Sequence, residues 1–266
     1  MQPKFWITVV VIVVGTVLAG YFLMQSDSPA PPAPAQPSTR PPPASGQSIT
    51  PEPAPAAPVI RYPLNSAVAS PLPELDKSDA GIMKALGELL GRKRLGLSFT
   101  DGVIRRVVAT VDNLPRQKLP VSVMPLKRVP KTFVTTGEGD SLAIGPSNSL
   151  RYTPYVRFFT AIDTANLVAL YVRFYPLFQK VYEDLGYPKG YFNDRLVEAI
   201  DDLLASPELP GSIKLVQPGV LYEFALPDLE ARSAGQKILM RMGRNNSAAV
   251  KTKLREIQQE VTNRPW

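Results

Sequence analysis

The stretch GYFNDRLVEAIDD, residues 190–202, sets aromatic rings beside charged side chains. Aromatic faces stack on sugars and peptides, and carboxylates accept hydrogen bonds from such ligands. A binding groove for these ligands combines both kinds of group. The candidate binding residues are therefore Tyr187, Tyr191, Phe192, Asp194, Arg195 and Glu198.

A glycosidase would need a more specific arrangement. It requires two carboxyl groups about 5–9.5 Å apart across a cleft, one of them with a raised pKa. Asp201 and Asp202 are adjacent in the sequence, so they point to different faces of a helix and make a poor pair. The sequence does not fix the distance from Glu183 to Asp194 or Glu198, so either pair could have the required separation. We nevertheless predict no catalytic residue.

A structural role explains the same stretch. Asn193 predicts a helix cap, because its side chain can accept hydrogen bonds from the first N–H groups of a helix. Asp194 would face the positive end of the helix dipole, and Arg195 can pair with Glu198 one turn later. We favour this role and confine any binding function to the aromatic start of the helix.

The amino-acid composition excludes several kinds of catalytic and metal site. The 266 residues include no His and no Cys, which excludes a His-dependent triad, a thiol nucleophile, a Cys/His zinc site and a haem held by His. Carboxylate chemistry, Ser–Lys chemistry and oxygen-ligated Mg²⁺ or Ca²⁺ remain open. Because no nucleophile constellation is evident, we expect a protein that is not an enzyme and that has no cofactor or metal.

The N-terminal segment predicts a membrane anchor. Residues 5–24 are uncharged and mostly apolar, and a helix of this length, at ~1.5 Å per residue, spans the ~30 Å core of a bilayer. A cleaved signal peptide is the alternative, but its apolar region is usually about 7–15 residues long. Lys4 precedes the span, which favours a cytoplasmic N-terminus. The protein would then be a single-pass protein of the bacterial cytoplasmic (inner) membrane, with its globular domain in the periplasm.

A proline-rich spacer follows the anchor. Residues 28–58 are mostly Pro, Ala, Ser and Thr, which cannot form a core, and Pro-rich chains extend at ~3.1 Å per residue. A PxxP ligand for another protein is the alternative interpretation. The predicted segments are a cytoplasmic N-terminus at 1–4, a transmembrane helix at 5–24, a Pro/Ala-rich linker at 25–71, a globular domain at 72–262 and a tail at 263–266.

The globular part predicts a mainly α fold, or α+β with a minor β-hairpin. Two β-branched runs flank Gly-Glu-Gly-Asp within residues 132–145, which suits a hairpin, and a further strand is expected near Val220–Phe224. The broad apolar stripe of residues 163–186 makes this helix the expected centre of the core. Apolar periodicity predicts helices near 79–91, 98–115, 147–162, 163–186, 193–204, 233–242 and 246–261.

The net charge of +7 is unevenly distributed. Residues 77–131 and 231–266 are basic, whereas residues 132–230 are acidic. We favour attraction between these segments within one domain. The functional alternative is a basic surface for anionic lipid headgroups or an acidic partner, and nucleic acid is an unlikely ligand because no nucleic-acid-binding motif is present. The basic surface would consist of Arg92, Lys93, Arg94, Arg105 and Arg106.

Five blocks of the sequence resemble one uncharacterised family of bacterial envelope proteins, described only as a domain of unknown function. The resemblance covers about residues 70–258 and implies an N-terminal anchor, a Pro/Ala-rich linker and a helical domain, but no activity. Its most specific block is residues 170–208. The other blocks are LPELDKSD (72–79), RRVVATVDNLPR (105–116), RYTPYVRFF (151–159) and SAGQKILMRMG (233–243).

These observations together predict a membrane-anchored, extracytoplasmic binding or adaptor domain of the bacterial cell envelope. Its partner would be an envelope protein, cell-wall glycan or anionic lipid headgroups. The alternative function is a carboxylate-dependent hydrolase that acts on cell-wall glycan.

Overall fold

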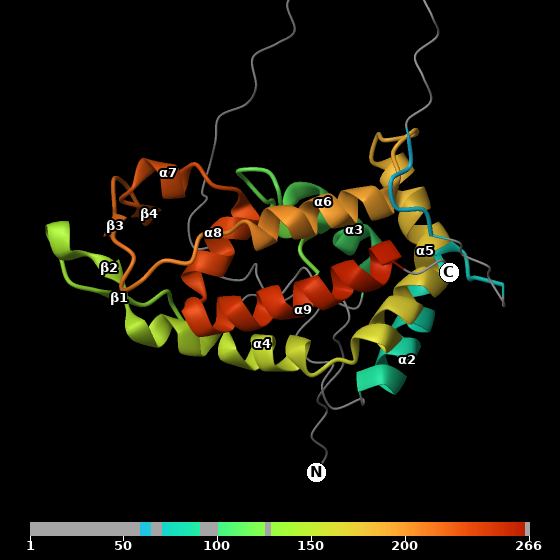
Figure 1. Cartoon of the computed structure of the whole chain (residues 1–266), viewed down its shortest axis with the longest axis horizontal. Helices are drawn as coiled ribbons and strands as arrows, with labels where there is room; N and C mark the ends of the chain where they lie inside the picture. Colours follow the sequence, from blue (N-terminus) through green and yellow to red (C-terminus); the bar gives the residue numbers. More distant parts are fainter. Residues whose placement is uncertain (1–58, 65–70, 91–100, 126–128, 264–266) are drawn as a thin grey trace, which may run out of the picture.

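The computed structural model describes residues 59–64, 71–90, 101–125 and 129–263 (Figure 1). The predicted transmembrane helix and most of the predicted linker lie outside these residues. None of the helices within the described ranges has both the length and the apolar character needed to cross a membrane.

The described chain is mostly helical and contains two short antiparallel hairpins, which confirms the predicted fold class at this level. The α-helices are α2 (Ser78–Leu90), α3 (Val103–Asn113), α4 (Thr153–Thr160), α5 (Thr164–Asp184), α6 (Phe192–Leu204), α7 (Pro227–Glu230), α8 (Ala234–Arg241) and α9 (Arg244–Asn263). Short 3₁₀ helices are η1 (Leu75–Lys77), η3 (Val121–Val123), η4 (Gly139–Ser141) and η5 (Pro146–Arg151).

Helix α9 lies in the middle of the helical part of the molecule, and α5 packs against it (Figure 1). Helix α5, predicted as central, contacts α2, α3, α6 and α9, while α9 contacts α4, α5, α6 and α8. The predicted apolar stripe of α9 is at most 3% exposed. The last helix therefore docks on the domain, as expected from its sequence. Its buried stripe consists of Val250, Leu254, Ile257 and Val261.

Several helix boundaries follow from local sequence. Asp163 caps α5 and Ser233 caps α8 through their side-chain oxygens. Gly243 has a φ of 84°, a left-handed conformation that glycine adopts without steric cost, and it ends α8. The sequence also makes Asn245 or Asn246 a candidate cap for the last helix, but α9 begins at Arg244, so both residues lie in its first turn and neither is its N-cap.

Asp79 makes a cap of a different kind. The sequence predicts that it caps its own helix, but its carboxylate accepts hydrogen bonds from the backbone N–H groups of Gly102 (2.7 Å) and Val103 (2.9 Å). These groups belong to the start of α3, whose own N-cap residue supplies no side-chain bond. Asp79 thus fixes α2 to the N-terminus of α3.

The two hairpins lie together at one end of the molecule (Figure 1). The predicted hairpin is β1 (Thr135–Thr136) paired with β2 (Ala143–Ile144), and the predicted strand near residue 220 is β4 (Glu223–Phe224), which pairs with the unpredicted β3 (Leu215–Val216). A 2.9 Å backbone hydrogen bond from Ile144 N to Ile213 O joins the hairpins.

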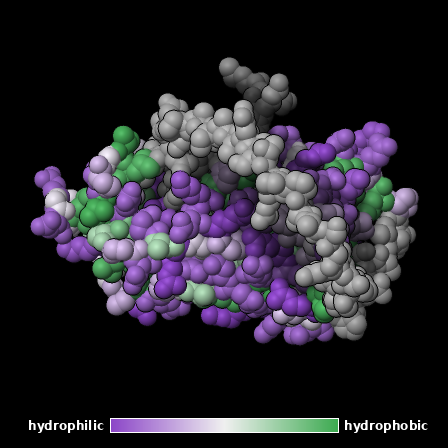
Figure 2. Space-filling view, turned by 90° about the horizontal axis from the view of Figure 1, so that it is seen from above, coloured by the Kyte–Doolittle hydropathy of each residue, from purple (hydrophilic) through white to green (hydrophobic). Residues whose placement is uncertain are grey.

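This end of the molecule also carries exposed apolar side chains. Val220 is 82% exposed and Leu226 is 60% exposed. Figure 2 shows hydrophobic atoms gathered at this end of a face that is otherwise mostly hydrophilic where it is coloured.

Candidate functional site

The structure divides the six candidate binding residues into three groups. Phe192 belongs to the core, because it is 1% exposed and its ring stacks on Phe178 with centroids 5.8 Å apart. Tyr191 and Asp194 contact a segment from the N-terminal part of the chain. The remaining three belong to a network of ion pairs and hydrogen bonds with α3, and they are Tyr187, Arg195 and Glu198.

The N-terminal segment, residues 61–64, is here called the strap. The Asp194 carboxylate accepts hydrogen bonds from the backbone N–H groups of Arg61 (3.0 Å) and Tyr62 (2.8 Å). The Tyr191 hydroxyl accepts a third from Leu64 N at 2.6 Å. Leu64 itself is 8% exposed and belongs to the core. These two candidate residues therefore hold the main chain of the protein's own strap.

Asn193 joins the strap to the rest of the core. Its Nδ2 donates to the carbonyl oxygens of Tyr62 (2.9 Å) and Val261 (3.2 Å), and its Oδ1 accepts from the Tyr171 hydroxyl (3.2 Å). The residue is fully buried. The N-cap of α6 is Tyr191, which supplies no side-chain bond, so the predicted cap at Asn193 is wrong. The amide turns inward because it pairs the buried Val261 carbonyl group and the partly buried Tyr62 carbonyl group.

Side chains of α5 satisfy the first N–H groups of α6 instead. Phe192 N donates to Gln179 Oε1 (2.8 Å), and Asn193 N donates to the Tyr175 hydroxyl (3.3 Å). Burial raises the pKa of the Tyr171 hydroxyl well above its ordinary value. Burial, followed by the hydrogen bond with Tyr191, likewise raises the pKa of Tyr175. Both phenols therefore stay protonated at neutral pH and serve as hydrogen-bonding groups.

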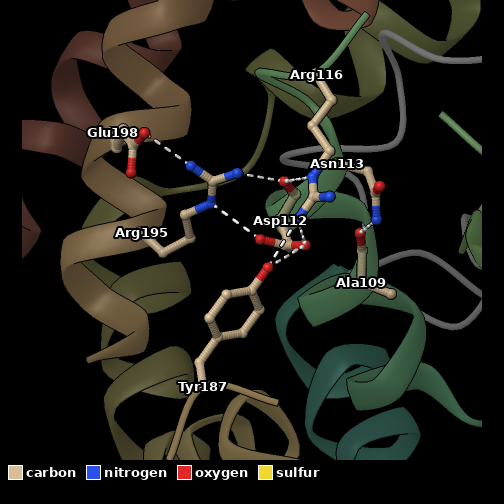
Figure 3. Close-up of polar contacts among 7 residues, drawn as sticks. All are labelled: Ala109, Asp112, Asn113, Arg116, Tyr187, Arg195 and Glu198. Atoms are coloured by element: carbon tan, nitrogen blue, oxygen red, sulfur yellow. Dashed lines mark hydrogen bonds and ion pairs between the residues drawn. The ribbon is translucent and has the colours of Figure 1, made fainter. Parts of the chain in front are cut away.

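The ion network centres on Asp112 of α3 (Figure 3). Its carboxylate accepts from Arg116 Nη2 (2.7 Å) and Arg195 Nε (3.2 Å), and Asp112 is 6% exposed. Arg195 also donates to the Asp112 carbonyl oxygen and pairs with Glu198 at 2.8 Å, which confirms the predicted pair. The Tyr187 hydroxyl accepts from Arg116 at 2.7 Å and donates to Asp112 at 3.4 Å.

The network holds Arg195 as a permanent cation. Burial lowers the pKa of its guanidinium, but the bonds to Glu198 and Asp112 outweigh burial and raise the pKa above its ordinary value. Neither Asp112 nor Arg116 was predicted as a site residue from the sequence. Asp112 lies at the end of α3 and Arg116 follows four residues later, a spacing that is a local signal for an ion pair but gives no indication of Arg195, which lies 83 residues beyond Asp112.

The described part of the predicted basic surface is engaged in contacts. Arg105 pairs with Asp76 at 2.9 Å, and Arg106 pairs with Asp101 at 3.1 Å. Arg106 also donates to the Ser122 carbonyl oxygen at 2.9 Å. The other members of this surface, Arg92, Lys93 and Arg94, lie outside the described residues.

We favoured attraction between the acidic and basic segments as the explanation of the uneven charge, and two ion pairs in the structure are examples of it. Lys237 Nζ lies 2.8 Å from Glu230, and Lys251 Nζ lies 3.5 Å from Glu208. Both lysine side chains are only 4% exposed. The C-terminal basic segment therefore contributes cations that pair with the acidic segment inside the domain.

The carboxylates considered for hydrolysis are all occupied by structural contacts. Glu183 accepts from Gln179 Nε2 at 2.8 Å, while Asp194 holds the strap and Glu198 pairs with Arg195. Burial raises the pKa of Asp202, but this carboxylate accepts from the Ser233 hydroxyl at 2.6 Å at the start of α8. Within the described ranges, no cluster of three or more acidic residues could hold a metal ion.

Comparisons with known proteins confirm that the chain belongs to a family of unknown function. A family model described as "Protein of unknown function (DUF3014)" matches residues 103–258. This range contains the ion network and Asn193 but not the strap. No curated protein and no solved structure matches the chain.

We predict that Asn193→Ala and Asn193→Asp both destabilise the protein. Loss of the Nδ2 donor leaves the buried Val261 carbonyl group and the partly buried Tyr62 carbonyl group without this donor, and an unpaired buried acceptor costs ~1–3 kcal/mol. Asp caps helices as well as Asn does, but it would direct a carboxylate at these carbonyl oxygens. Urea unfolding followed by circular dichroism measures the loss. Wild-type stability of Asn193→Asp would restore the capping explanation.

We also predict unequal effects for two carboxylates that contact the same arginine. Asp112→Asn should lower the free energy of unfolding by ~2 kcal/mol or more, because Asp112 is nearly buried and also pairs with Arg116. The control, Glu198→Gln, should cost less than ~1 kcal/mol because the Glu198 side chain is 53% exposed. Equal losses in the same unfolding assay would contradict this difference.

Proposed function

Because the chain belongs to the DUF3014 family, whose description assigns no function, we propose a function from its own residues. The protein is a membrane-anchored binding domain of the bacterial cell envelope that retains a partner without cleaving it. Residues 5–24 anchor it in the cytoplasmic membrane, and the Pro-rich linker holds the helical domain away from the bilayer in the periplasm.

The observation that carries this proposal is the attachment of the strap. Residues 61–64 are close in sequence to the Pro-rich segment, and three side chains of α5–α6 bind their main chain: Tyr191, Asn193 and Asp194. The end of the linker is thereby fastened to the domain. A fastened linker limits the orientations of a tethered domain, which lowers the entropy that a binding partner must remove.

The chemistry of these contacts also favours binding. Asp194 accepts two consecutive backbone N–H groups, Asn193 donates to a carbonyl group, and Tyr191 accepts from a further N–H group. These side chains recognise an extended main chain, and here that chain is the protein's own strap. Asp194, one of the carboxylates considered for hydrolysis, is engaged by the strap.

We predict that alkaline phosphatase fused to the C-terminus is active in a bacterium with two membranes. This enzyme needs disulfides, which form outside the cytoplasm, and Lys4 before the apolar span favours export of the remainder of the chain. Phosphatase activity in intact cells measures the topology. Fluorescence of a reporter that folds only in the cytoplasm, fused at the same position, would reject it.

We further predict that the full chain in detergent micelles sediments with purified peptidoglycan without releasing soluble fragments. The matched control is the Glu183→Gln/Glu198→Gln double variant, which should sediment equally because neither carboxylate has a catalytic role. Soluble fragments released in proportion to the protein added, and lost in the double variant, would favour the hydrolase instead.

A further inference from the structure

A groove of about 790 Å³ lies between α4, the first turn of α9 and the loop that precedes β3. It is here called the α4–α9 groove. It shares no residue with the strap, with Asn193 or with the ion network. Its volume is in the range of sites that bind ligands or peptide segments, ~300–1,000 Å³.

The floor of the groove is apolar. Val156 of α4 is 4% exposed, while Leu239 and Met240 of α8 are 0% and 6% exposed. Leu150 lines the same groove and is 67% exposed. An apolar group of a ligand would therefore find contacts both inside the groove and at Leu150.

Free cations line the groove from two helices. Arg157 of α4 and Arg244 of α9 are exposed, and neither has an ion pair or a side-chain hydrogen bond with another described residue. The one carboxylate among the described lining residues, Glu208, pairs with the buried Lys251. The unpaired charge of the groove is positive, so it complements an anionic ligand.

The loop of residues 207–213 supplies unpaired main chain. Within the described part of the chain, the backbone N–H and C=O groups of Glu208, Leu209, Gly211 and Ser212 make no hydrogen bond. Pro207 and Pro210 restrict this stretch to conformations outside a helix. The N–H groups of Glu208, Leu209, Gly211 and Ser212 and the C=O groups of this loop are therefore available to bond the main chain of a bound polypeptide.

We propose that the α4–α9 groove binds an extended, acidic segment of a partner polypeptide. The main chain of the segment pairs with residues 208–212, and its carboxylates face Arg157 and Arg244. Successive side chains of an extended peptide point to opposite sides, so acidic residues alternate with apolar residues that contact Leu150 and the groove floor. The groove is separate from the strap. A variant that no longer binds the peptide should therefore still sediment with the cell wall.

The test uses the full chain in detergent micelles and a short fluorescent peptide in which glutamates alternate with leucines. A peptide with lysine in place of glutamate is the control ligand. We expect the acidic peptide to bind at least about tenfold more tightly than the lysine peptide, and Arg157→Glu or Arg244→Glu to weaken it about tenfold. Peptide binding should also slow amide hydrogen exchange at Leu209, Gly211 and Ser212.

Arg255→Glu is the matched control variant. Arg255 is an exposed, unpaired arginine of α9 within the described residues, but it does not line the groove, so this variant should bind the acidic peptide like wild type. Equal weakening by Arg255→Glu would show general charge attraction and overturn the proposal. Failure of the acidic peptide to bind would also overturn the proposal. If the peptide does not bind and Arg157→Glu and Arg244→Glu reduce binding to phosphatidylglycerol vesicles, the two arginines bind lipid headgroups and the proposal is wrong. Equal melting temperatures of the three variants verify that the fold is intact.

Discussion

The buried amide of Asn193 determines how the parts of this domain meet. Its bonds connect the strap through Tyr62, the last turns of α9 through Val261 and the core helix α5 through Tyr171. A buried amide whose partners are displaced loses several hydrogen bonds that water cannot replace. These three segments therefore have one favourable arrangement, and the start of α6 lies at their junction.

Carboxylates fix other segments in a similar way. Asp79 of α2 holds the start of α3, Asp194 of α6 holds the strap, and Asp202 of α6 holds the start of α8. In each case an acidic side chain bonds a group that belongs to another part of the chain. The acidic residues that first suggest a reaction centre thus connect segments that the short apolar helices alone would position less precisely.

Helix α9 connects the proposed binding groove to the strap. Its first residue, Arg244, lines the α4–α9 groove, and Val261 near its end contacts Asn193 beneath the strap. At ~1.5 Å per residue these positions lie roughly 25 Å apart along the helix. A partner bound in the groove would therefore be held at the opposite end of α9 from the linker, where the strap does not obstruct it.

The sequence by itself determined the features that depend on neighbouring residues. These are the helices with apolar periodicity, the first hairpin and the pair of Arg195 with Glu198. Only the tertiary structure decided what Asn193 and Asp112 do. An asparagine at a helix start has the same sequence pattern whether it caps the helix or bonds carbonyl groups 131 and 68 residues away. Packing brings such partners together, and a spacing of that length leaves no periodic signal in the sequence.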